Sequence, residues 1–108
     1  MPVFPPDEYS FVKFEKSKRV NKKYSAILQN KKTGRTKTLP FGSSLHENYK
    51  DETGLNMYPE KMHGDIKRLE LYRKRHAGEG DESRKYSPGW FSWHFLWRRP
   101  GETAPKLT

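Results

Sequence analysis

The residues that could do acid–base or metal chemistry are four histidines, at positions 46, 63, 76 and 94, and carboxylates in polar stretches. His46, Glu47, His63 and Asp65 are the types that a metal-dependent nuclease site built from a hairpin and a helix uses. The histidine spacings match no zinc-binding pattern, and the chain has no cysteine. We therefore expect no catalytic residue, no cofactor and no metal, and a small metal-dependent nuclease that uses His46 or His63 remains an alternative.

Positive charge is concentrated in one stretch of the chain. The formal net charge is +9, and residues 13–37 hold ten lysines and arginines against one acid, Glu15, so this stretch accounts for all of it. Positive charge that is concentrated in this way attracts polyanions such as nucleic acid or acidic protein surfaces. We expect one polyanion-binding surface, formed by Lys13, Lys16, Lys18, Arg19, Lys22, Lys23, Lys31, Lys32, Arg35 and Lys37.

A secondary basic site is formed by Arg73, Lys74 and Arg75, at the end of a predicted helix. Cations there are favourable beside the negative end of the helix dipole, which is a purely structural reason for them. Binding of a phosphate or a carboxylate is the competing interpretation. The sequence leaves both open.

Five aromatic residues crowd a segment of eight near the C-terminus. Large rings bury 150–250 Å² each, roughly, so a chain short of aliphatic residues can build a core from them. We expect an aromatic core, and regard a base-stacking platform or a membrane-interface helix as weaker alternatives. The core residues are Trp90, Phe91, Trp93, Phe95 and Trp97.

The pattern along the chain predicts three strands followed by two helices. Alternating and β-branched or aromatic residues indicate strands at 9–15, 24–29 and 36–41, and Pro40 indicates that the third strand lies at an edge or ends there. Residues 43–59 read as a long loop, with a helical turn near 45–49, that binds something or is held by a partner.

Both helices show start signals. The first helix spans 60–76 by its apolar spacing, with a start nearer Asp65 because Gly64 disfavours helix. The second has Ser87 as its N-cap and Pro88 in its first position, and it ends before Pro100.

These elements predict an α+β fold: a small antiparallel β-meander of about three strands, packed by two C-terminal helices, with extended N- and C-terminal arms. We assign residues 1–8 to the first arm, 9–99 to a single domain and 100–108 to the C-terminal tail. The 108 residues allow one domain. At 31% hydrophobic and 14% aromatic residues, the core is lean but the chain is not typical of disorder.

Composition also bears on location. No apolar run approaches the length of a membrane span, and the start of the chain lacks the basic and apolar regions of a signal peptide. A membrane role is therefore not expected. We expect a location in a virion or in the interior of a host cell, in the cytoplasm or nucleus, without secretion.

A further pattern joins the two halves of the chain across residues 24–98. It comprises Phe41-Gly42, His63-Gly64-Asp65, Arg68, Tyr72, Arg75-His76, the run from Ser87 to Trp93, and Leu96-Trp97. With the lysine-rich β segment before it, this pattern resembles a family of short uncharacterised proteins encoded by large DNA viruses of algae and amoebae. The resemblance implies a viral setting and no particular mechanism.

Together these features favour a non-enzymatic small basic virion structural protein, as a minor capsid or internal virion component. Its basic hairpin would bind acidic capsid surfaces, other virion proteins or the genome, and no small-molecule substrate is expected. The first alternative is a sequence-nonspecific protein that binds DNA or RNA, and the second is the metal-dependent nuclease.

Overall fold

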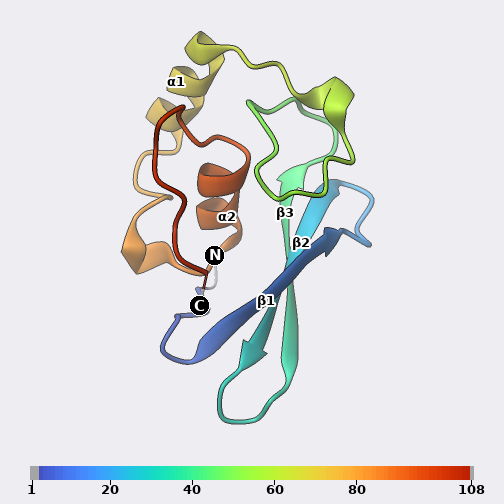
Figure 1. Cartoon of the computed structure of the whole chain (residues 1–108), viewed down its shortest axis with the longest axis vertical. Helices are drawn as coiled ribbons and strands as arrows, with labels where there is room; N and C mark the ends of the chain where they lie inside the picture. The colour runs from blue at the N-terminus through green and yellow to red at the C-terminus, as the bar shows by residue number, and fades with distance from the viewer. Residues whose placement is uncertain (1–2, 108) are drawn as a thin grey trace.

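The computed structural model describes residues 3–107, so the first two residues of the predicted N-terminal arm and the last of the C-terminal tail lie outside it. A three-stranded antiparallel sheet, in the order β1-β2-β3, is followed by two helices (Figure 1). The α+β class predicted from the sequence is confirmed. The elements are β1 (Tyr9–Lys16), β2 (Lys22–Asn30), β3 (Thr36–Ser43), η1 (Pro59–Lys61), α1 (Ile66–Arg75), η2 (Glu82–Arg84) and α2 (Pro88–Phe95).

β1 and β3 begin where the alternating pattern predicts, whereas β2 begins two residues earlier, and each strand ends one or two residues later than predicted. The central strand β2 pairs with both neighbours, and Ala26 lies opposite Phe14 on one side and Leu39 on the other. Pro40, which cannot donate a backbone hydrogen bond, lies on the edge strand β3 as predicted.

A β-bulge at Val12 explains how β1 presents its rings to the core. The register shifts between Phe11 and Lys13, so that Phe11 lies opposite Leu28 and Phe14 opposite Ala26. In a regular strand, two residues three positions apart point to opposite faces. The extra residue restores both rings to one face, where their centroids lie 4.7 Å apart.

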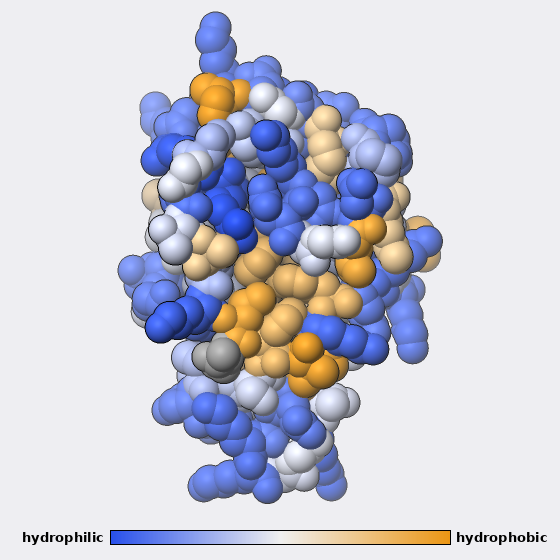
Figure 2. Space-filling view, viewed as in Figure 1, coloured by the Kyte–Doolittle hydropathy of each residue, from blue (hydrophilic) through white to orange (hydrophobic). Residues whose placement is uncertain are grey.

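The core lies between the inner face of the sheet and α2. Figure 2 shows apolar residues gathered across the middle of one face of the molecule, with mostly hydrophilic surface below them. Trp90, Phe91 and Phe95 of the predicted aromatic core are buried, but Trp93 and Trp97 are only half-buried and lie at its rim. The buried cluster is Tyr24, Ala26, Leu28, Leu39, Phe41, Tyr86, Trp90, Phe91, Phe95 and Leu96.

Both helices start at the predicted caps. The carboxylate of Asp65 accepts hydrogen bonds from the backbone N–H groups of Lys67 (2.9 Å) and Arg68 (3.4 Å). The Ser87 hydroxyl accepts one from Trp90 N (3.2 Å), with Pro88 as the first helical residue. These caps satisfy N–H groups that have no partner within the helix, so local sequence decides where each helix begins.

The terminal segments pack on the body of the protein itself. Phe4 and Tyr86 exchange two backbone hydrogen bonds, of 2.8 and 2.9 Å, and the Phe4 ring lies edge-on to Tyr9. At the other end, Leu107 packs against the core cluster.

The long connection from β3 to η1 is also held by the protein's own residues. The helical turn expected at 45–49 is wrong: a turn at Ser44 and Leu45 is followed by a parallel bridge between Asn48 and Met62. Backbone N–H groups of Tyr49 and Lys50 both donate to Leu96 O, at 3.1 Å each. Tertiary hydrogen bonds thus replace the local ones that a helical turn would have made.

Candidate anion-binding site

The basic residues of the 13–37 stretch do not form the single surface expected from the sequence. Consecutive turns of an antiparallel meander lie at opposite ends of its strands, and strands of this length separate them by about 25 Å. Figure 1 shows the β2–β3 turn at one tip of the molecule and the β1–β2 loop beside the other end of the sheet. The topology of the strands therefore divides the positive charge between the two ends of the sheet. A count of charges along the sequence does not reveal this division.

Nine of the ten basic side chains are exposed or half-exposed, and eight of these nine fall into two groups of four. We call those on and beside the β1–β2 loop the β1–β2 basic cluster, and those at the β2–β3 turn the β2–β3 basic cluster. The first comprises Lys16, Lys18, Arg19 and Lys22, and the second Lys31, Lys32, Arg35 and Lys37.

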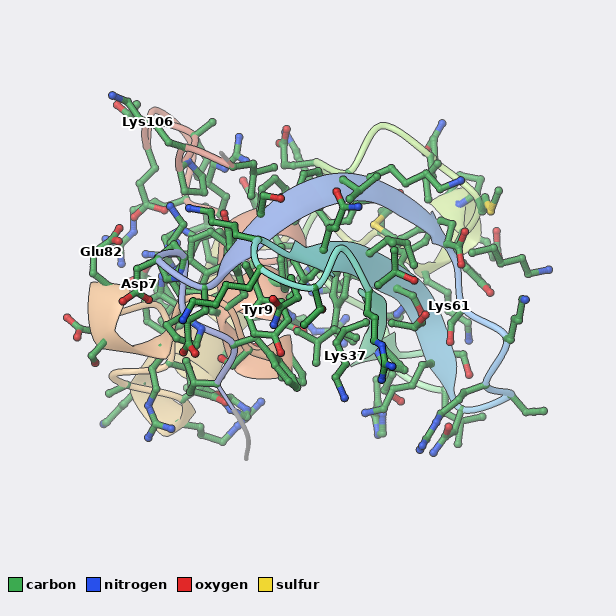
Figure 3. The ribbon with its side chains drawn as sticks, turned by 90° about the horizontal axis from the view of Figure 1, so that it is seen from below. Asp7, Tyr9, Lys37, Lys61, Glu82 and Lys106 are labelled. Carbon is green, nitrogen blue, oxygen red and sulfur yellow. The ribbon has the colours of Figure 1, made fainter. Side chains whose placement is uncertain are left out.

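The two clusters differ in their acidic neighbours. The turn before β1 carries Asp7 and Glu8 to the β2–β3 basic cluster, where Lys31 N donates to Glu8 O at 2.9 Å. Figure 3 views the molecule from this end, with Asp7 and Lys37 on either side of Tyr9. Residues 16–22 contain no acidic residue. The β1–β2 basic cluster is therefore the less neutralised of the two.

The remaining two residues of the predicted surface have other environments. Lys13 lies on β1, where its ammonium is 3.9 Å from the carboxylate of Glu15. Lys23 is corrected from a surface contact to a buried residue: it is 1% exposed, and its Nζ donates to Ser43 O (2.6 Å) and His46 O (2.5 Å).

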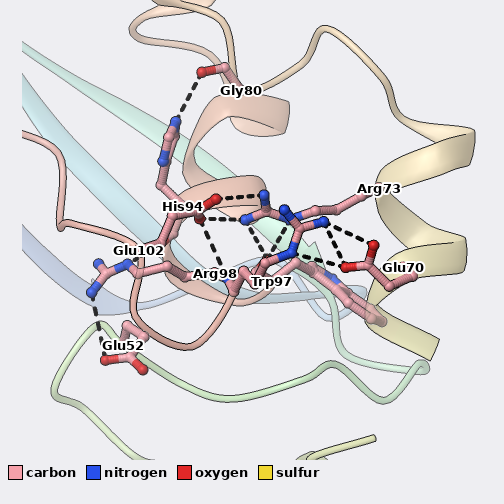
Figure 4. A network of polar contacts seen from close by, with 9 residues as sticks. Glu52, Glu70, Arg73, Gly80, His94, Trp97, Arg98 and Glu102 are labelled. Carbon is pink, nitrogen blue, oxygen red and sulfur yellow. Dashed lines mark hydrogen bonds and ion pairs between the residues drawn. The ribbon is translucent and has the colours of Figure 1, made fainter. Parts of the chain in front are cut away.

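The secondary basic site is also altered, because Arg73 is buried and neutralised. Its guanidinium donates to both carboxylate oxygens of Glu102, at 2.7 and 2.5 Å, and to Trp97 O (Figure 4). These hydrogen bonds hold the pKa of Glu102 below its ordinary value. Lys74 and Arg75 remain exposed. The site therefore has two available cations, and Arg73 fastens α1 to the segment after α2.

Two further ion pairs connect this C-terminal segment to the rest of the protein. Arg99 makes a two-oxygen contact with Glu70 of α1 (2.6 and 2.8 Å), and Arg98 lies 3.7 Å from Glu52 of the long loop (Figure 4). The segment thus bridges α1 and the loop, which form opposite sides of a cleft.

This cleft has a volume of about 630 Å³ and lies between the end of β3, the following loop, α1 and α2. Its apolar wall includes Phe41, Leu96 and the exposed side chain of Leu71. Gly42 permits close packing there, since a Cβ at this position would lie 2.6 Å from Leu96 Cδ1. The size of the cleft and its apolar lining are typical of a site that binds a small molecule.

Charged groups at the cleft are predominantly positive. Four cationic side chains and two carboxylates line it, which leaves a net charge of +2 with the histidines neutral. Arg68 of α1 reaches across to Glu47 of the loop at 2.7 Å, and this contact holds the pKa of Glu47 below its ordinary value. The cations are Lys22, Lys23, Arg68 and Arg75.

One wall of the cleft is a stack of rings on α1 and after α2. The Tyr72 ring lies parallel to that of Trp97, with centroids 4.1 Å apart, and stacks on His76 at 4.3 Å from its other side. Both faces of Tyr72 are therefore covered. The stack makes a rigid wall and leaves no open Tyr72 face for a ligand to stack on.

The histidines proposed for metal binding are used locally. His46 Nδ1 contacts Ser43 Oγ at 2.8 Å, and His63 Nδ1 accepts a hydrogen bond from Asp65 N at 2.9 Å. Burial, with the nearby Arg68, lowers the pKa of His63. Within residues 3–107, no group of three His, Asp or Glu side chains is placed to hold a metal ion.

Sequence reasoning did not find the cleft, although several of its residues had been singled out for another reason. Arg68, Tyr72, His76 and Trp97 belong to the pattern on which the viral resemblance rests, and all four line the cleft. Spacing alone could not unite these four residues with the rest of the cleft lining, which extends along the chain from Lys22 to Trp97.

Comparisons with protein-family models, with curated proteins and with solved structures find no significant match to this chain. Among residues 3–107, no helix combines the length and the apolar character needed to cross a bilayer.

Proposed function

We propose that this is a small non-enzymatic structural protein that links two polyanionic surfaces, nucleic acid in the first place, through its two basic clusters. The observation that carries this proposal is the placement of four cations at each end of one sheet, about 25 Å apart along the strands. Two separated clusters on one rigid body can engage two partners, whereas a single patch engages one.

The chemistry of such binding is electrostatic and independent of sequence. Each phosphate contact releases a counterion, and four contacts weaken binding by about 100-fold between 50 and 200 mM salt. Since the β1–β2 basic cluster has fewer acidic neighbours, it supplies the tighter contact.

A salt-titrated binding assay with duplex DNA tests this proposal. Changing Lys16, Lys18 and Arg19 to glutamine should weaken binding more than the same change at Lys31, Lys32 and Arg35. A matched control changes Lys67, Lys74 and Lys106, which lowers the net charge equally and should have the smallest effect. Equal weakening by all three variants would show that net charge alone matters.

Linking is tested separately, by asking whether the protein holds a fluorescent duplex on beads that carry a second duplex. The wild type should retain it, and either cluster variant should not. Binding without linking would reduce the role to a single-sided nucleic-acid-binding protein.

The viral setting is part of the proposal and is supported only by the resemblance stated above. In that setting the protein would be a minor capsid or internal component that joins the genome to acidic capsid surfaces. Proteomics of purified particles tests it, with stoichiometric presence expected.

A further inference from the structure

Lys23 is a buried cation that makes no ion pair among residues 3–107. Its Nζ is bonded only to the backbone oxygens of Ser43 and His46, and no carboxylate in residues 3–107 forms an ion pair with it. Burial, together with the neighbouring Lys61, lowers its pKa to about 8. It is still largely protonated at neutral pH. Because an unpaired buried charge is costly, the position favours an anion nearby.

The cleft beside Lys23 is where such an anion can enter. Lys22, Lys23 and Arg75 all line it, and within the part of the chain that the structure describes the Arg75 guanidinium has no hydrogen bond or ion pair. Arg68 contributes a second guanidinium, shared with Glu47. A guanidinium presents a planar fork of donors that matches phosphate oxygens.

We propose that this cleft binds a phosphate group, held by Lys22 and Arg75 and opposed by the buried charge of Lys23. A phosphate monoester carries about −1.5 to −2 at pH 7, which matches the cleft's net charge of +2, whereas a carboxylate would leave half of it unmatched. The phosphate can belong to a small molecule or to a nucleic-acid chain. The inference does not rest on the linking role of the basic clusters.

Calorimetric titration with AMP and with adenosine tests the phosphate requirement. AMP should bind and adenosine should not. Arg75→Gln should weaken AMP binding by about tenfold, the effect of one charge-assisted hydrogen bond. Lys74→Gln, which removes a neighbouring exposed charge outside the cleft, should leave it unchanged. Equal effects of the two variants would overturn the proposal.

A nucleic-acid source is tested with a single-stranded DNA oligonucleotide. If AMP fails to bind but Arg75→Gln weakens DNA binding several-fold more than Lys74→Gln, the cleft takes a chain phosphate. If neither probe distinguishes the two variants, the proposal is wrong. The variant of Lys31, Lys32 and Arg35 should weaken DNA binding and leave AMP binding intact, which separates this cleft from the linking role.

Proton uptake gives a readout that a merely structural role of Lys23 would not produce. At pH 8, a bound anion should draw a proton onto Lys23, as measured by titration in buffers of different ionisation enthalpy. Lys23→Met, checked for folding by its melting temperature, should abolish the uptake; its persistence would assign the proton to a cleft histidine and overturn the role of Lys23. The charged groups facing Lys23 are Lys61, Asp51, Glu47 and Glu60, and the cleft histidines are His46 and His76.

Discussion

The hydroxyl of Tyr24, on the central strand, donates a 2.5 Å hydrogen bond to Oδ2 of Asp51, 27 residues away in the long loop. The same hydroxyl accepts a hydrogen bond from Met57 N at 3.0 Å, and the other Asp51 oxygen accepts from Thr53 N at 2.8 Å. Asp51 thus organises the loop internally and fastens it to the sheet. Because the loop also supplies one side of the cleft, this contact helps to set the cleft's shape.

Tyr24→Phe should lower the free energy of unfolding by about 1–2 kcal/mol, because it leaves Asp51 and Met57 N short of a buried partner. Urea denaturation measures the change. Tyr58→Phe is the control, since the Tyr58 ring packs edge-on to Tyr24 but its hydroxyl has no hydrogen-bond partner within residues 3–107. It should change stability by less than about 0.5 kcal/mol. Equal effects would mean that Tyr24 acts through its ring alone.

Alkaline pH should unfold the protein through its tyrosines. Burial is the main cause that raises the pKa values of Tyr24, Tyr72 and Tyr86 above the ordinary value of 10. A raised folded-state pKa contributes stability that is complete below pH 10 and is lost as pH rises towards the folded values. Melting temperature should therefore fall above pH 10, with tyrosinate absorbance rising together with unfolding. A tyrosinate signal that is complete before unfolding begins would contradict the burial.

Lys23 should act in the opposite direction over a lower range. Its pKa is about 8 when folded and 10.5 when unfolded, so between these values the unfolded chain holds a proton that the folded chain has released. Stability therefore rises with pH in this window. Comparing the melting temperatures of wild type and Lys23→Met from pH 7.5 to 9.5 isolates the effect, because other groups contribute to both. The melting temperature of the wild type should rise relative to that of the variant as pH increases. Parallel melting profiles would show that Lys23 is not desolvated.

The features that could be predicted from the sequence are those that depend on residues close together in the chain. Strand limits follow from alternation, and both helix starts follow from Asp65 and from Ser87 with Pro88, because a cap needs only its next three residues. The overall α+β class follows from these elements.

The predictions that were wrong concern features that depend on contacts between segments far apart in the sequence. Lys23 was expected in the polyanion-binding surface and Arg73 in the secondary basic site, yet both are buried, Lys23 against backbone oxygens and Arg73 against Glu102. The charge of residues 13–37 could be counted from the sequence, but its division between two ends required the turn positions in space. The cleft, formed by four separate segments of the chain, had no local signal.

The Val12 bulge predicts an unusual tolerance of deletion. Removing Val12 should leave Phe11 opposite Leu28 and Phe14 opposite Ala26, now in a regular strand with both rings still facing the core. Removing Ser25 from β2 should instead place Tyr24 and Ala26 on opposite faces. Circular dichroism and thermal melting should show a folded Val12 deletion and an unfolded Ser25 deletion. Loss of fold in the Val12 deletion would mean that the bulge has a role beyond register.

The aromatic residues of α2 should differ sharply in their contribution to stability, contrary to a uniform aromatic core. Trp90 is fully buried, so Trp90→Ala should cost about 3–5 kcal/mol, enough to unfold a domain of this size. Trp93 is half-buried, with the Arg73 guanidinium 4.4 Å above its ring, so Trp93→Ala should cost about 1–2 kcal/mol. Urea denaturation of both variants measures the difference, and tryptophan fluorescence reports it independently, because Trp93 should be the more accessible to a quencher. Equal losses would place Trp93 in the core with Trp90.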